Sequence, residues 1–156
     1  MSALIQCHFD YACSAWYSGL TKRSKLRLQV AQNKVIRFLL NVPPRAHIGP
    51  DEFRKIGMLP VEQRVNQLKL NHMYNIFNGH APEYMKNQVQ RYSNCYNTRN
   101  SISSFVIPRV KGCGIHSFNY TGAVLWNSLP LSLRQCNSIS VFKKSVKPHL
   151  MSNRSQ

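Results

Sequence analysis

The sequence predicts a mostly α-helical protein with at most a short pair of strands, and three observations support this fold class. Apolar residues recur at the three- and four-residue spacing of amphipathic helices. Proline or glycine stands at the ends of most of these segments, as expected at helix boundaries. Apolar residues make up 43% of the 156 residues, which argues against disorder despite a net charge of +16. This length suits one ordinary domain, which would bury roughly 70% of its unfolded surface.

The opening stretch is predicted to form one helix that ends at residues 18–19. Helical spacing places four of its side chains on one face, with an indole beside them: Leu4, His8, Tyr11, Ala15 and Trp16. We expect both tryptophans, Trp16 and Trp126, to anchor the core rather than to stack on bases.

A stronger helix is predicted over residues 22–40. Its apolar stripe, which we expect to face the core, consists of Leu28, Ala31, Val35 and Phe38. Its other side carries basic residues three, four or seven positions apart: Arg23, Arg27, Lys34 and Arg37. Residues 41–44 end this helix, because the two prolines there cannot donate to a helix and restrict the residue before them.

Three further helical segments begin at prolines. Pro50 precedes two acidic residues, which favour the positive end of the helix dipole, and Gly57 ends this short segment. Pro60 begins a longer helix that residues 78–79 end. Its positions spaced for burial are Val61, Val65, Leu68 and Ile76. Pro82 begins one or two more turns, up to about residue 89.

The second half is different in character. Residues 90–104 are polar and predict a loop, and Pro108 confines any strand over residues 105–110 to a sheet edge. A helix resumes at Ser117 and ends at Pro130, with one side formed by Phe118, Gly122, Leu125 and Leu129. Ser138 caps a last amphipathic helix, up to Pro148. In it Ile139, Phe142 and Val146 face inward, and the residues that face outward are Lys143, Lys144 and Lys147.

The distribution of charge favours binding over catalysis. All five carboxylates lie in the first 83 residues: Asp10, Asp51, Glu52, Glu62 and Glu83. Residues 84–156 contain ten Lys and Arg and no carboxylate. Two aspartates cannot build the carboxylate cluster that two-metal phosphoryl transfer needs, so we identify no catalytic residue. The excess of positive charge indicates a polyanionic partner.

The basic side of the helix over residues 22–40 is the best candidate for binding a nucleic acid. A helix of this length extends roughly 28 Å, enough to follow several phosphates. Lys and Arg neutralise phosphates without reading the base sequence, and Gln32 and Asn33 add hydrogen-bond donors. The last helix adds Lys143, Lys144 and Lys147. A solvated helix face is the alternative interpretation, and we expect no membrane partner, because the apolar side of the last helix must supply the fold.

No cofactor or metal is expected. Cys113 and His116 have half of a zinc-ligand spacing, but the second close pair of ligands is missing. The five cysteines are scattered and odd in number, which favours a reducing compartment. There is no signal-peptide pattern and no apolar run near the roughly 18 residues of a membrane span. We therefore expect an intracellular protein, nuclear or cytoplasmic.

Three stretches, taken together, carry a resemblance to a known family. They are residues 8–16 (HFDYACSAW), residues 28–37 (LQVAQNKVIR), and residues 125–130 (LWNSLP) followed by 142–144 (FKK). In this order and at these separations they resemble the C-terminal segment of LINE-type (non-LTR) retrotransposon reverse transcriptases. That segment follows the polymerase palm and begins in the helical thumb. The similarity covers about residues 4–150.

The resemblance implies a helical thumb-like region at residues 1–89, then a polar seam at 90–116, a smaller α-rich region at 117–150 and a tail at 151–156. In the family, thumb helices grip the template–primer duplex by its backbone. The matching residues here are Gln32, Asn33, Lys34 and Arg37. RNA or the backbone of an RNA–DNA hybrid is the partner that this implies.

The polymerase centre of the family uses two adjacent aspartates on a palm hairpin, and these 156 residues contain no Asp-Asp pair. We therefore expect a non-catalytic nucleic-acid-binding fragment of a reverse transcriptase, from a reading frame truncated to begin near the thumb helices. Two alternatives stay open. In the first, the chain is an interaction remnant whose apolar surface needs the missing palm domain or another retroelement chain. In the second, polymerase activity is assigned to the chain only because of its similarity to the family.

Overall fold

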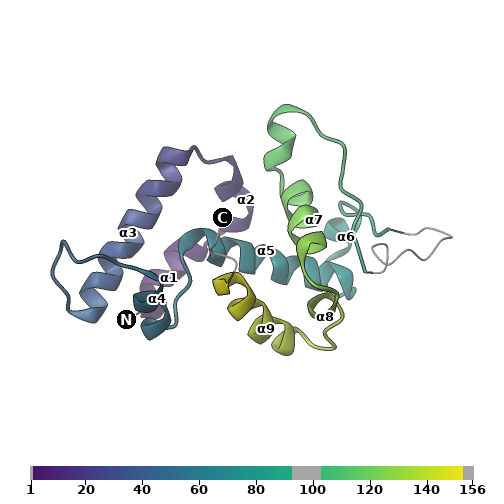
Figure 1. Cartoon of the computed structure of the whole chain (residues 1–156). Coiled ribbons are helices and arrows are strands. Elements are labelled where there is room, and N and C mark those ends of the chain that lie inside the picture. The colour runs from purple at the N-terminus through teal and green to yellow at the C-terminus, as the bar shows by residue number, and fades with distance from the viewer. Residues whose placement is uncertain (1, 93–102, 153–156) are drawn as a thin grey trace. The chain divides into compact units, whose positions relative to one another are not determined.

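The computed structural model describes residues 2–92 and 103–152. These residues form a mostly helical protein, which confirms the predicted fold class (Figure 1). They contain no strand, and an isolated antiparallel bridge joins Arg91 and Phe105. The chain divides into two compact units, residues 1–65 and 66–156, and the boundary lies within helix α5 (Val61–Phe77).

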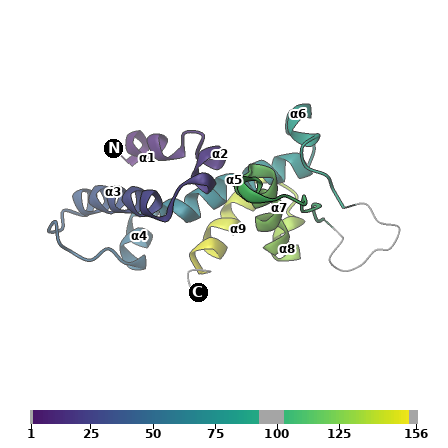
Figure 2. The same cartoon turned by 90° about the horizontal axis from the view of Figure 1, so that it is seen from above.

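The first unit is built around its longest described helix, α3, which lies lengthwise in Figure 2. Its elements before α5 are α1 (Ser2–Asp10), α2 (Cys13–Trp16), the 3-10 turn η1 (Tyr17–Gly19), α3 (Lys22–Leu40) and α4 (Pro50–Ile56). The second half of α3 packs against α4 and its flanking loops. The core at this contact consists of Ile36, Ile48, Phe53 and Met58.

The opening segment forms two helices rather than the single helix predicted. Ala12 adopts a left-handed conformation, with φ of 46°, between α1 and α2. This interruption resets the helical register, so that Cys13 and Tyr17 are buried, whereas Tyr11 of the predicted inner face is 81% exposed. The predicted face is therefore wrong, and the side chain of Leu4 lies outside the described part of the chain.

The predicted bounds of α3 are confirmed, and the residues at its ends explain them. The hydroxyl of Thr21 accepts a hydrogen bond from the N–H of Ser24 at 3.3 Å and so caps the first turn. At the other end Asn41 adopts a left-handed conformation, with φ of 51°. Its own N–H and that of the next residue donate to carbonyls of the last turn, which ends the helix.

Helices α4 and α5 also begin and end as predicted. Gly57, with φ of 70°, ends α4. After α5, the N–H of His80 donates to the carbonyl of Asn75 at 2.8 Å, and the N–H of Gly79 donates to that of Ile76 at 3.3 Å. These are the two bonds of a Schellman motif, and Gly79 has the left-handed φ of 78° that it requires. The predicted inner positions that are buried are Val61, Val65 and Ile76.

The second unit has an aromatic core centred on Trp126, which is 0% exposed. Beyond α5 its elements are α6 (Glu83–Lys86), the 3-10 turn η2 (Gly112–His116), α7 (Phe118–Ser128), α8 (Leu131–Arg134) and α9 (Ile139–Ser152). The ring centroid of Trp126 lies 5.4 to 5.8 Å from those of Phe77, Phe105 and Phe142. Its indole N–H donates to the carbonyl of Ser103 at 2.8 Å. The prediction that Trp126 anchors a core is confirmed.

The apolar sides predicted for α7 and α9 are confirmed, because both pack into this core. The hydroxyl of Ser138 accepts from the N–H of Val141 at 3.3 Å, as expected of a cap. The predicted end of α9 is wrong: Pro148 lies inside the helix, which continues to Ser152. Leu150, beyond the proline, is buried in the core and holds the last turn against it.

Gly79→Ala is expected to destabilise the second unit by about 1 kcal/mol, because L-residues are disfavoured in the left-handed region. Sterics do not contribute, since a Cβ at this position would meet no atom within 4 Å. Gly19→Ala is the matched control, because its surroundings are equally open and its φ is not left-handed. Urea unfolding followed by circular dichroism measures both variants. Equal losses would contradict the conformational role of Gly79.

Candidate nucleic-acid interface

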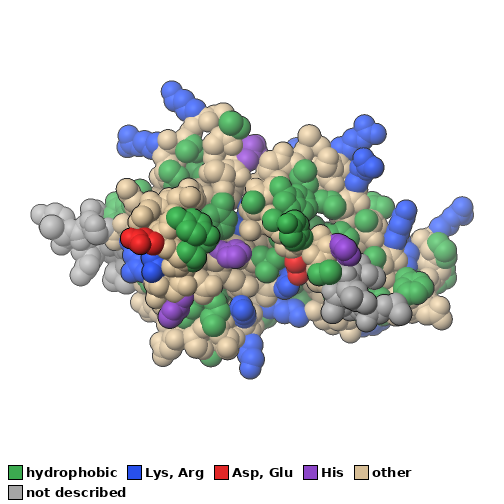
Figure 3. All heavy atoms as spheres, turned by 180° about the vertical axis from the view of Figure 1, so that it is seen from behind, with side chains coloured by type: hydrophobic (Ala, Val, Ile, Leu, Met, Phe, Trp, Pro, Cys, Tyr) green, Lys and Arg blue, Asp and Glu red, His purple; other side chains and the backbone are tan. Residues whose placement is uncertain are grey.

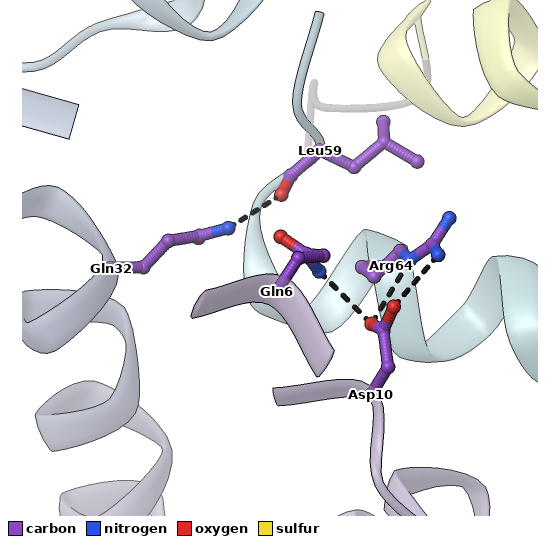
Figure 4. A network of polar contacts seen from close by, with 5 residues as sticks. All are labelled: Gln6, Asp10, Gln32, Leu59 and Arg64. Carbon is purple, nitrogen blue, oxygen red and sulfur yellow. Dashed lines mark hydrogen bonds and ion pairs between the residues drawn. The ribbon is translucent and has the colours of Figure 1, made fainter. Parts of the chain in front are cut away.

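Two glutamine amides fix the orientation of α3 within the first unit. Gln32 is 0% exposed, and its Nε2 donates to the carbonyl oxygen of Leu59 at 2.8 Å (Figure 4). Gln29 accepts at Oε1 from the N–H of Val61 at 3.1 Å and donates through Nε2 to Oε1 of Gln32 at 3.0 Å. A buried polar group without a partner costs about 1–3 kcal/mol, so these bonds favour one rotation of α3 about its axis.

This rotation differs from the one that the apolar stripe predicted. Ala31 and Phe38 were expected inside, but Ala31 is exposed and Phe38 is 70% exposed. The buried side is centred instead on Gln32 and Ile36, both 0% exposed. The apolar residues that flank this side are Leu28, Val35 and Leu39. They are a signal for the correct face, but a glutamine at its centre interrupts the apolar pattern.

Three of the predicted cations lie together on the exposed side of α3, and we call them the cationic face. Arg23, Arg27 and Lys34 are all exposed. At about 100° per residue they fall within an arc of about 40°, and they span about 16 Å along the axis. That length corresponds to roughly five nucleotides at about 3.4 Å each. No Asp or Glu occurs in α3 to neutralise them.

The other predicted residues of α3 make structural contacts. Nε of Arg37 donates to the carbonyl of Ala46 at 2.9 Å and holds the loop between α3 and α4. Asn33 is half-buried, and its Oδ1 accepts from Nε2 of Gln29 at 2.9 Å. Gln32 has no exposed surface with which to contact a phosphate. The prediction that Gln32 contacts a nucleic acid is therefore wrong, because its amide binds the carbonyl of Leu59 in the interior.

Apolar side chains share this exposed side with the cations, which the sequence pattern did not reveal. Leu26, Val30 and Phe38 are 64%, 44% and 70% exposed. By helical spacing Val30 lies beside the cationic face, and the other two flank it. The outer side of α3 is therefore mixed in character, basic along its centre and apolar at its margins.

Trp16, expected in the core, is 38% exposed and lies near the cationic face. An open cavity of about 400 Å³ forms where η1 leads into α3, lined by Trp16, Leu20, Ser24, Arg27 and Leu28. Arg27 thus belongs to both the cationic face and this cavity. The left-handed turn at Ala12 explains the error, because it displaces Trp16 from the register that the opening helix predicted.

Asp10 is engaged in an ion pair with Arg64. Nε and Nη2 of Arg64 donate to its two oxygens at 3.1 and 2.8 Å, and Nε2 of Gln6 donates at 2.9 Å (Figure 4). Burial raises the pKa of Asp10, but the hydrogen bonds from Arg64 and Gln6, with the charge of Arg64, outweigh it and hold the pKa below its ordinary value. The pair joins α1 to the start of α5.

In the second unit, α9 carries the further cations that were predicted. Lys143 and Lys144 are exposed, and Lys147 is half-buried. Phe142 and Val146 are 0% exposed, which confirms the predicted separation of basic and apolar sides. As in α3, the helix contains no carboxylate.

Cys113 and His116 lie at exposed positions of η2. Among the described residues, no group of three or more metal-binding side chains comes together, and Cys95 lies outside them. None of the described helices combines the length and the apolar character that crossing a bilayer requires.

No protein-family model, curated protein or solved structure matches this chain. Function is therefore inferred from the chemistry of the surface. Figure 3 shows one face, on which Lys and Arg side chains project at many points and carboxylates appear in few places. This distribution agrees with 21 Lys and Arg against five Asp and Glu in the sequence.

Asp10→Asn is expected to lower the free energy of unfolding at pH 7 by about 1–2 kcal/mol, because it removes the charge-assisted hydrogen bonds. A depressed pKa stabilises the fold above the ordinary aspartate pKa of about 3.9, and this contribution is lost as the pH falls through the lower value in the folded protein. The difference between the wild type and Asp10→Asn should therefore shrink below about pH 4. Urea unfolding at several pH values measures it, and a constant difference would contradict the ion pair.

Proposed function

We propose that this chain binds the sugar–phosphate backbone of RNA or of an RNA–DNA hybrid and catalyses no reaction of its own. The cationic face of α3 supplies the main contacts, and the lysines of α9 supply further ones. The exposure of Arg23, Arg27 and Lys34 on a helix without carboxylates carries this proposal.

A helix with this charge favours a polyanion, because phosphate contacts release the counterions condensed on a nucleic acid. Long, exposed cations contact phosphates whatever the base sequence, so the cationic face positions a strand without specifying its sequence. The net charge of +16 adds a long-range attraction that raises the rate of association.

The contacts of the carboxylates support a non-catalytic role. Asp10 pairs with Arg64, and Asp51 lies 3.3 Å from Arg54. Glu52 accepts at 2.8 Å from a backbone N–H at the start of α4. Metal-dependent phosphoryl transfer needs several carboxylates that converge on one point, whereas these three have separate partners.

The resemblance to the thumb of LINE-type reverse transcriptases supports the choice of nucleic acid. In that family, thumb helices hold the template–primer duplex by its backbone, and α3 contains the stretch at residues 28–37 that carries part of the resemblance. Within this proposal the chain is a segment of a retroelement polymerase, and a template–primer hybrid is its ligand.

Replacing Arg23, Arg27 and Lys34 together by serine is expected to weaken binding to a short RNA–DNA hybrid. Each phosphate contact contributes about 0.9 to the slope of log affinity against log salt, so three lost contacts lower that slope by about 2.7. Anisotropy titrations between about 50 and 200 mM salt measure both the affinity and the slope.

A matched control replaces the exposed cations Arg45, Arg54 and Lys55, which lie in the same unit outside α3. Both triple variants lose the same charge, so any effect of net charge alone is equal in the two. Equal losses of affinity would contradict the assignment to α3. A wild-type chain that does not bind the hybrid at low salt would contradict the proposed function itself.

A protein partner is the second candidate, and the exposed apolar side chains of α3 favour it. Leu26 and Phe38 are among the most exposed large apolar residues that the structure describes. Aromatic side chains such as Phe38 are enriched at protein interaction sites. The palm domain of a reverse transcriptase or another retroelement chain is the partner that this candidate implies.

Leu26→Ser combined with Phe38→Ser separates the two candidates. If phosphate contacts dominate, the double variant keeps its affinity for the hybrid within about twofold, because surface substitutions away from a contact cost at most about 0.5 kcal/mol. If the apolar margins dock a polypeptide, the wild type self-associates in sedimentation velocity and the double variant does not. A loss of hybrid affinity as large as that of the cationic triple variant would contradict phosphate contacts as the main interaction.

A further inference from the structure

The open cavity beside the cationic face contains aromatic and apolar side chains, which contacts to a sugar–phosphate backbone would not require. Its lining combines an indole, two leucines, one hydroxyl and one guanidinium, and includes no carboxylate. Its lining residues come from the end of α2, the link between η1 and α3, and the first half of α3. Its volume of about 400 Å³ is at the small end of the range for ligand sites in proteins. The occupant is therefore small, partly apolar and anionic or attached to an anion.

The indole of Trp16 is fixed in position. Its Nε1 donates to the carbonyl of Tyr11 at 2.9 Å, and its ring centroid lies 6.2 Å from that of the buried Tyr17. These contacts restrain the ring while leaving 38% of the residue exposed. Leu20 and Leu28 are half-buried and add apolar surface. A restrained aromatic ring loses little conformational freedom when a flat ligand stacks on it.

We infer that this cavity receives an unpaired nucleobase of the strand that crosses the cationic face. The base stacks on Trp16, and the phosphate attached to its nucleotide contacts Arg27. This inference rests on the proposed function, because Arg27 belongs to both the cavity and the cationic face. Aromatic stacking beside a cation that tracks the backbone is the usual chemistry of single-strand binding.

The preferred ligand is therefore a hybrid with a single-stranded end or an unpaired nucleotide. A fully paired duplex cannot fill the cavity, because its bases stay stacked within the helix unless one is extruded. Every base has a π-face, so the cavity tolerates any sequence. Stacking on one aromatic side chain contributes on the order of tenfold in affinity per base.

Three hybrids with the same paired region test this inference by anisotropy. One is blunt-ended, one has a single-stranded extension, and the third has the same extension built from abasic nucleotides. The abasic extension keeps the phosphates and removes the bases, so it is the matched control. We expect the intact extension to bind about tenfold more tightly than the abasic one, and Trp16→Leu to remove this difference.

Tryptophan fluorescence gives a second readout that needs no variant. Trp126 is 0% exposed, so a ligand at the surface changes mainly the emission of Trp16. The intact extension should quench this emission, and the abasic extension should leave it unchanged. Equal quenching by both extensions would overturn the inference even if Trp16→Leu failed to fold.

The outcomes separate this inference from the proposed function. If the blunt hybrid binds and the two extensions bind equally, the inference is overturned and the proposed function stands. If none of the three hybrids binds, both are overturned. A preference for the intact extension that persists in folded Trp16→Leu places the base elsewhere and overturns the inference.

Discussion

The orientation of α3, and with it the outer surface of this helix, depends on the hydrogen bonds of two glutamine amides on its inner side. The amide of Gln32 donates to the carbonyl of Leu59, and Gln29 accepts from the N–H of Val61. These bonds favour one rotation of α3, because a polar group in the interior must keep its hydrogen-bond partners. Turning α3 to bury Phe38 would expose Gln32 and break these bonds. The cations and the apolar residues on the outer side therefore face outward together, as a consequence of what lies on the inner side.

Carboxylates of the first unit make contacts within the chain's own structure. Hydrogen bonds from the backbone at the start of α4 hold the pKa of Glu52 below its ordinary value, and Asp10 binds Arg64. Residues 66–156 contain one carboxylate, Glu83. Arg134 in that unit is 7% exposed and donates to neutral oxygens, the carbonyl of Leu129 and the hydroxyl of Ser104, rather than to a carboxylate. The exposed cations of α3 and α9 lie on helices that contain no carboxylate.

The mixed character of the first unit suits a ligand with both charged and aromatic parts. A nucleic-acid strand has a charged backbone on one side and flat bases on the other, and Arg27 lies where the cationic face meets the cavity beside Trp16. A polypeptide partner would use the apolar margins, Leu26 and Phe38, and would need carboxylates to match the cations between them. The two candidate ligands would therefore contact different side chains of the same surface.

The sequence by itself determined the bounds of helices α3, α4 and α5. Caps, prolines and left-handed residues act within a few positions, so the bounds of α3, α4 and α5 follow from local chemistry. It also determined that Arg23, Arg27 and Lys34 share a side, because helical spacing alone places them there. Only the tertiary structure decided which side faces inward, since the partner of Gln32 lies 27 residues away. The exposure of Trp16 was decided in the same way, because the left-handed turn at Ala12 is not visible in the apolar pattern.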